Sequence, residues 1–139
     1  MPLIREALNN GRSVRFHPKG TSMLPMLREG KDTVTLSPVP EKLRKFDLPL
    51  YQRDNGKYVL HRIIRAEDTY TMMGDNQFIP EPGIRHDQII GVVTAFSRGQ
   101  REYPVTYPAY RLYCGVWHAS RPLRHLARRV INKLRRMLS

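Results

Sequence analysis

The sequence predicts a mainly β fold with a short N-terminal helix and a basic, helical C-terminal extension. Two observations support this prediction. After Gly11, short apolar segments alternate with turn residues, and the chain holds 11 prolines and 9 glycines. Near residue 109 the pattern changes to helical spacing. At 139 residues the chain is large enough for a real core. We therefore expect a β domain over residues 1–108 and a helical extension over residues 109–139.

Each element follows from a local pattern. The apolar spacing of Leu3, Ile4, Ala7 and Leu8 predicts a helix that ends at Gly11. Alternating or apolar segments with turn residues at their ends predict strands. These segments are residues 13–16, 32–36, 47–53, 56–66, 69–73, 88–96 and 101–105. Segment 56–66 is the longest predicted strand, and 69–73 is its hairpin partner. Segment 76–87, "NQFIPEPGIRHD", is interrupted by prolines and is predicted to be a loop.

The last thirty residues predict two helices. Tyr110, Tyr113 and Trp117 share one helical face, and Pro122 marks the start of a second helix. That second helix carries one row of apolar residues, which we call the apolar stripe. Its members are Leu123, Leu126, Val130, Leu134 and Met137.

The net charge of +12 is concentrated at the C-terminus. Residues 110–139 contain eight Arg or Lys and no acid, so they carry +8 of the total. Three interpretations remain open for this extension. The second helix, residues 121–138, could lie on an anionic membrane surface, or its stripe could pack on the β body; nucleic-acid binding ranks third. The aromatic face slightly favours contact with a membrane or a partner.

Composition also bears on the compartment. The single cysteine, Cys114, cannot form an internal disulfide, which favours a reducing environment. No apolar run approaches the roughly 20 residues needed to span a bilayer. Arg5 and Glu6 argue against a signal peptide at the start. We expect a cytoplasmic protein that could associate peripherally with the inner face of the membrane.

The segment "GTSMLP", residues 20–25, points to chemistry because it places one hydroxyl between a glycine and a proline. A serine becomes a nucleophile only when a nearby base takes its proton. His61, in "YVLHRII", is the best candidate base, because an imidazole titrates close to neutrality. A core histidine bonded to a backbone carbonyl is the structural alternative.

A carboxylate that orients the histidine would strengthen the pair. Asp75 in "MMGDNQ" and Asp87 in "HDQIIGVV" are the two candidates. Either could instead be an ordinary turn or loop-end residue.

In this order, "GTSMLPML", "VLHRII", "MMGDNQ" and "HDQIIGVV" resemble the motifs of the signal-peptidase and LexA-like superfamily of serine peptidases, in its Ser–His branch. The resemblance extends over about residues 14–96. It implies the β-ribbon or barrel fold of that family; because no apolar run is long enough to span a bilayer, we expect a form that lacks a transmembrane anchor. It also implies a serine endopeptidase that cleaves an extended peptide or leader and needs no metal or cofactor.

The resemblance implies a role for each matched residue. Ser22 is the nucleophile and His61 the general base, while Asp87 best matches the orienting acid and Asp75 the residue that braces the site. The expected substrate-binding residues are Gly20, Thr21, Met23 and Pro25. The sequence departs from the family at Gly20, where many signal peptidases place a serine that helps to bind the oxyanion. Loss of one such donor costs roughly 10²–10³ in rate. A catalytically weak peptide-binding or membrane-associated module that retains the fold is therefore the alternative function.

Overall fold

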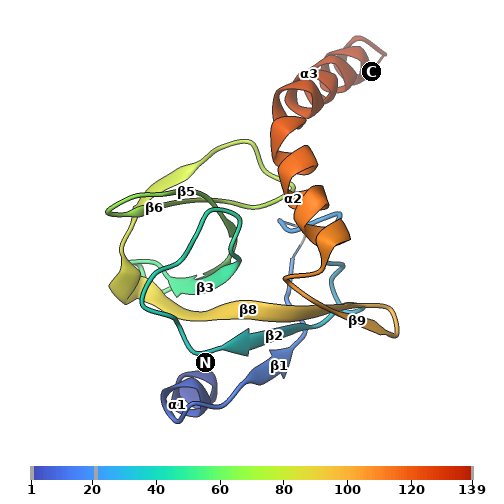
Figure 1. Cartoon of the computed structure of the whole chain (residues 1–139). Helices are drawn as coiled ribbons and strands as arrows, with labels where there is room; N and C mark the ends of the chain where they lie inside the picture. The colour runs from blue at the N-terminus through green and yellow to red at the C-terminus, as the bar shows by residue number, and fades with distance from the viewer. Residues whose placement is uncertain (1, 21, 139) are drawn as a thin grey trace.

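The protein is mainly antiparallel β, with a curled half-barrel sheet and accompanying helices (Figure 1). The computed structural model describes residues 2–20 and 22–138. The elements are α1 (Pro2–Asn9), β1 (Val14–Phe16), β2 (Val34–Ser37), β3 (Pro49–Gln52), β4 (Tyr58–Leu60), β5 (Arg62–Ala66), β6 (Tyr70–Met73), β7 (Glu81–Ile84), the 3₁₀ helix η1 (His86–Gln88), β8 (Ile89–Arg98), β9 (Arg101–Pro104), α2 (Pro108–Ala119) and α3 (Arg121–Leu138).

Two antiparallel sheets form the body. The larger has the order β1-β2-β8-β3-β4, with β9 also paired to β8. The smaller has the order β5-β6-β7. Strand β8 is the longest strand described; its first half, residues 89–93, is buried on both faces, which fits its apolar sequence and its position between β2 and β3. The predicted hairpin between the strand that ends at Ala66 and segment 69–73 is confirmed as β5–β6, and β8 and β9 form a second antiparallel hairpin.

The core consists of two clusters of buried side chains. One lies among α1, the loop after Ser22, the larger sheet and α2, and includes Leu8, Leu27 and Cys114. The other contains side chains of both sheets, with Tyr51, Ile63 and Met72 at its centre. Tyr51 in β3 and Met72 in β6 are fully buried, and most other residues of these two strands are buried as well. This burial accounts for the mostly apolar sequences of β3 and β6.

The sequence prediction of one long strand over 56–66 is wrong. The chain leaves the larger sheet after Leu60 and enters the smaller sheet at Arg62, so His61 lies at the crossing between them. Strand β4 pairs with β3, whereas β5 pairs with β6. An unbroken apolar pattern cannot reveal this switch, because both halves have strand-like sequence.

The prediction that 76–87 is entirely a loop is also wrong. Residues Glu81–Ile84 form β7, and His86–Gln88 form η1. Strand β7 lies at the edge of its sheet and pairs only with β6. An edge strand can hold Pro82, because the missing backbone N–H does not interrupt a ladder between two neighbours.

The C-terminal extension has two different surroundings. Helix α2 packs on the body and buries Tyr110 and Cys114. Helix α3 projects beyond the body in Figure 1, and no described residue of it is buried. Among residues 2–20 and 22–138, no helix is both long and apolar enough to cross a bilayer.

Candidate functional site

The predicted nucleophile Ser22 lies on a loop that contacts the turn after β6. The Ser22 carbonyl accepts a hydrogen bond of 2.8 Å from the backbone N–H of Asn76. Gly74 makes this contact sterically feasible, since a Cβ there would lie 2.5 Å from the Ser22 carbonyl oxygen and 3.1 Å from its Cβ. The glycine of "GDN" is therefore required by the close approach of the serine loop.

The predicted base His61 borders the same glycine from the opposite strand. Arg62 pairs with Met73 in the β5–β6 ladder. This is the last pair of the ladder, where opposed Cα atoms are about 5 Å apart, and His61 and Gly74 are the next residues along each chain segment. The two-sheet crossing thus brings the backbone of His61 to the neighbourhood of the glycine that the Ser22 loop contacts, although His61 and Ser22 are 39 positions apart in sequence.

The side chains of this pair line different cavities. Ser22 lines one of about 380 Å³, whose wall includes Phe16, Lys19 and residues 58–60. His61 lines one of about 610 Å³, together with residues 77–82 and two residues of α3. A rotation of the imidazole about its side-chain torsions is needed to direct it toward the Ser22 cavity.

The His61 ring contacts a tyrosine–glutamate pair. The Tyr51 hydroxyl donates to Glu81 at 2.7 Å and lies 3.4 Å from His61 Nδ1, a long and weak contact. Since the Tyr51 hydrogen is directed at Glu81, Tyr51 can offer His61 only an acceptor. This favours hydrogen on Nδ1 and leaves the Nε2 lone pair available. Glu81 is itself held by Arg53 through two bonds of 2.9 and 3.0 Å.

Burial, with a smaller contribution from the Arg53 charge, lowers the pKa of His61 to about 4. The charges of Glu81 and Asp75 oppose this effect. The imidazole is therefore neutral at neutral pH, which is the protonation state that a general base requires.

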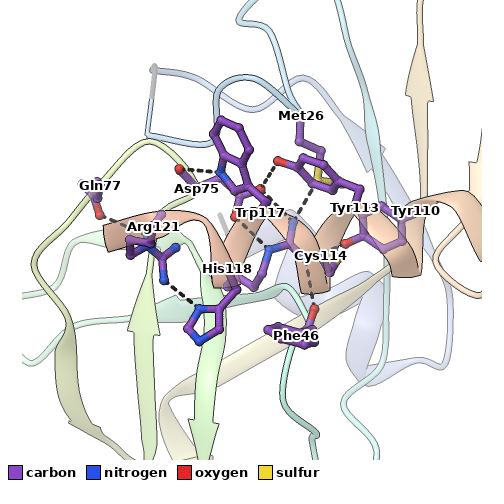
Figure 2. Close-up of polar contacts among 12 residues, drawn as sticks. Met26, Phe46, Asp75, Gln77, Tyr110, Tyr113, Cys114, Trp117, His118 and Arg121 are labelled. Carbon is purple, nitrogen blue, oxygen red and sulfur yellow. Dashed lines mark hydrogen bonds and ion pairs between the residues drawn. The ribbon is translucent and has the colours of Figure 1, made fainter. Parts of the chain in front are cut away.

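Asp75 is the centre of a buried polar cluster directly after Gly74 (Figure 2). Arg62 donates Nε to Asp75 Oδ1 at 2.8 Å and Nη2 to Oδ2 at 3.0 Å. From α2, Tyr113 donates its hydroxyl to Oδ2 at 2.7 Å, and Trp117 donates Nε1 to the Asp75 carbonyl at 2.8 Å. The remaining guanidinium N–H groups of Arg62 reach the Phe46 carbonyl, the Tyr110 hydroxyl and the sulfurs of Cys114 and Met26.

The aromatic face of α2 contacts this buried cluster. Tyr110, Tyr113 and Trp117 point into the body, where they surround the Arg62–Asp75 pair. The interpretation of this face as a membrane contact is therefore wrong. Spacing alone identified a shared face but not the buried ion pair that it covers.

Asp87 lies in η1 and has an exposed carboxylate. It pairs with Arg85 at 3.1 Å on the surface. The residues that line its neighbouring cavity do not include His61. Of the two aspartates, the structure brings only Asp75 next to the Ser22 loop, and the orienting role of Asp87 stays a prediction.

The predicted substrate-binding residues have different surroundings. Gly20 is exposed at φ 87°, a left-handed conformation that favours glycine, and a Cβ there would meet nothing within 4 Å. Met23 is 4% exposed and belongs to the core, although it also lines the Ser22 cavity. Pro25 is exposed, and its carbonyl accepts a bond from Arg98. Thr21 lies outside the described residues.

Sequence reasoning missed four residues of this region: Arg53, Arg62, Tyr51 and Glu81. Arg62 had a visible signal, since it is a charge inside the apolar segment "VLHRII" and Asp75 offers the opposite charge. Tyr51 and Glu81 had none, because each lies in a segment that reads as ordinary strand or loop. Within the described part of the chain, no group of three His, Cys, Asp or Glu is placed to hold a metal ion.

Comparison with protein-family models finds no match to this chain, and comparison with curated proteins finds none either.

Proposed function

We propose that the protein is a serine endopeptidase of the signal-peptidase-like class, with Ser22 as nucleophile and His61 as general base. The observation that carries this proposal is the position of Gly74, which the serine loop touches and which directly follows Met73, the ladder partner of the residue after His61. The mainly antiparallel β body with its N-terminal helix is compatible with the signal-peptidase and LexA-like fold that the sequence motifs imply.

In the proposed reaction, Ser22 Oγ attacks the scissile carbonyl of a peptide while His61 Nε2 accepts the hydroxyl proton. The imidazolium then gives that proton to the leaving amine, and an acyl ester remains on Ser22. Water, deprotonated by the same nitrogen, hydrolyses the ester and restores the free serine. Asp75 acts as a positioning residue, because it fixes the turn that holds both Gly74 and the Asn76 N–H bonded to the serine loop.

Two edge strands favour an extended peptide as substrate. Strands β1 and β4 end the order of the larger sheet, so among the described residues each has one side without a neighbouring strand. Phe16 of β1 and residues 58–60 of β4 line the Ser22 cavity. A peptide added as a strand along such an edge would gain main-chain hydrogen bonds and place its carbonyl near Ser22.

The test compares wild type with Ser22→Ala on a library of peptides rich in small residues. Cleavage should disappear in Ser22→Ala and persist in Ser13→Ala, which removes an equivalent hydroxyl from an exposed surface site. Labelling by a fluorophosphonate, located by mass spectrometry, should occur at Ser22 only. Equal cleavage by wild type and Ser22→Ala would refute the proposed mechanism.

A peptide-binding module with little turnover is the second candidate. It is favoured by the separate cavities that Ser22 and His61 line, and by Gly20 in place of an oxyanion donor. Fluorescence polarisation distinguishes the two functions. A binding module should bind labelled peptides both as wild type and as Ser22→Ala. Its wild type should also cleave none of them at any pH from about 5 to 9, roughly the range in which a histidine base operates.

A further inference from the structure

Helix α3 is held on the body by its polar side. His125 stacks on Phe78 with ring centroids 4.6 Å apart, and Arg124 lies 3.6 Å over the Trp117 ring. Arg128 donates to the Asn76 side chain at 3.3 Å. These contacts between α3 and the body come from basic or polar residues of its first two turns.

The apolar stripe faces the opposite way. At about 100° per residue, Leu123, Leu126, Val130, Leu134 and Met137 fall within an arc of about 80°, and Ala127, Ile131 and Leu138 extend it to about 140°. The seven Arg and Lys of the helix occupy the rest of its surface. The five stripe residues are between 49% and 72% exposed. The alternative that the stripe packs on the β body is thus wrong.

We propose that α3 binds an anionic lipid bilayer, with the apolar stripe inserted among the acyl chains and the flanking arginines at the phosphate headgroups. Helices with an apolar face and a strongly basic polar face bind in this way. The inward polar side and outward apolar side give the helix the orientation that such binding requires. This proposal is independent of the peptidase chemistry.

Charge and shape select lipid over two other occupants. A second copy of α3 would bring seven more positive charges and no acid against the first, so self-association of the stripe is electrostatically opposed. A nucleic acid would use the arginines but leave the exposed apolar stripe in water. Of these three occupants, the anionic bilayer is the one that matches both the apolar and the basic face.

In the bound state the His61 cavity lies near the bilayer. His125 and Arg128, on the polar side of α3, line that cavity together with His61. The cavity is therefore separated from the lipid by about one helix diameter, on the order of 10 Å.

The test uses the 139-residue chain and flotation with phosphatidylcholine vesicles, with or without phosphatidylglycerol. The stripe variant Leu126→Gln, Val130→Gln, Leu134→Gln changes no charge. The matched variant Arg129→Gln, Lys133→Gln, Arg135→Gln removes three charges and leaves the stripe intact. Fluorescence of Trp117, the single tryptophan of the chain, checks that the α2–α3 contact is retained in both.

Wild type should float with anionic vesicles and bind neutral ones much more weakly. The stripe variant should bind anionic vesicles at least tenfold more weakly, because three inserted aliphatic side chains are lost. The charge variant should weaken anionic binding by about 100-fold and change neutral binding little.

Three results would overturn the proposal. One is no flotation of wild type with anionic vesicles at low salt. Another is equal flotation of wild type and the stripe variant, which would mean simple charge adsorption of the kind a nucleic-acid binder shows. The third is a concentration-dependent dimer in sedimentation velocity that the stripe variant abolishes, which would assign the stripe to a second copy.

Discussion

Replacing Asp75 by Asn should destabilise the protein more than almost any other single conservative change. The carboxylate is 1% exposed and its partner Arg62 is 3% exposed. Asparagine keeps the size but removes the charge, so Arg62 stays buried without its counter-ion. Breaking a buried pair in this way costs about 3–5 kcal/mol. Tyr113, whose hydroxyl pKa is raised by burial and by Asp75, also loses a charged acceptor.

Urea denaturation followed by Trp117 fluorescence and far-ultraviolet circular dichroism measures this effect. A loss of about 4 kcal/mol, with a slope of about 2 kcal/mol per molar urea, shifts the midpoint by about 2 M. Asp87→Asn is the matched control, because its carboxylate is 74% exposed and pairs with an Arg85 that is 53% exposed. The control should lose less than about 1 kcal/mol. Similar losses in the two variants would refute the reasoning, because burial of the pair would then not matter.

Three further changes test the site. Gly74→Ala should displace the serine loop, since the new Cβ would meet the Ser22 carbonyl at 2.5 Å; thermal melting should show a loss of about 1–3 kcal/mol. His61 has a folded pKa of about 4 against an ordinary 6.5, so the unfolded chain takes up the proton first as pH falls. Wild type should therefore lose about 3 kcal/mol of stability between pH 6.5 and 4 relative to His61→Gln, and parallel pH profiles would contradict this. The Glu81 carboxylate raises the pKa of His61, so Glu81→Gln should lower that pKa further, as NMR titration of the imidazole can measure. An unchanged or raised pKa would count against the Tyr51–Glu81 arrangement.

Local patterns predicted most elements correctly because those elements depend on neighbouring residues. The N-terminal helix, the β5–β6 hairpin and the two C-terminal helices follow from apolar spacing and from breakers such as Gly11 and Pro122. The division of 56–66 between two sheets could not be predicted, because pairing partners distant in sequence decide it. Strand β7 was missed because tolerance of Pro82 depends on an edge position that only the tertiary fold defines.

The chemical types of the candidate-site residues could be predicted from the sequence, but their contacts could not. Ser22, His61 and Asp75 were recognised from their motifs, and the fold brings their backbones around Gly74. The pairing of Asp75 with Arg62 depends on a side-chain register across β5 and β6, which composition does not reveal. The direction of the α3 stripe was equally hidden, since a helical wheel shows two faces without saying which one the body takes.

A path of two hydrogen bonds connects α3 to the loop that carries Ser22. Arg128 contacts the Asn76 side chain, and the Asn76 backbone N–H contacts the Ser22 carbonyl. A displacement of α3 would therefore be transmitted to the loop that carries the proposed nucleophile. If the proposed peptidase and membrane functions both hold, vesicles should alter the turnover of short peptides that do not bind lipid, an effect that enrichment of substrate at the membrane surface cannot produce.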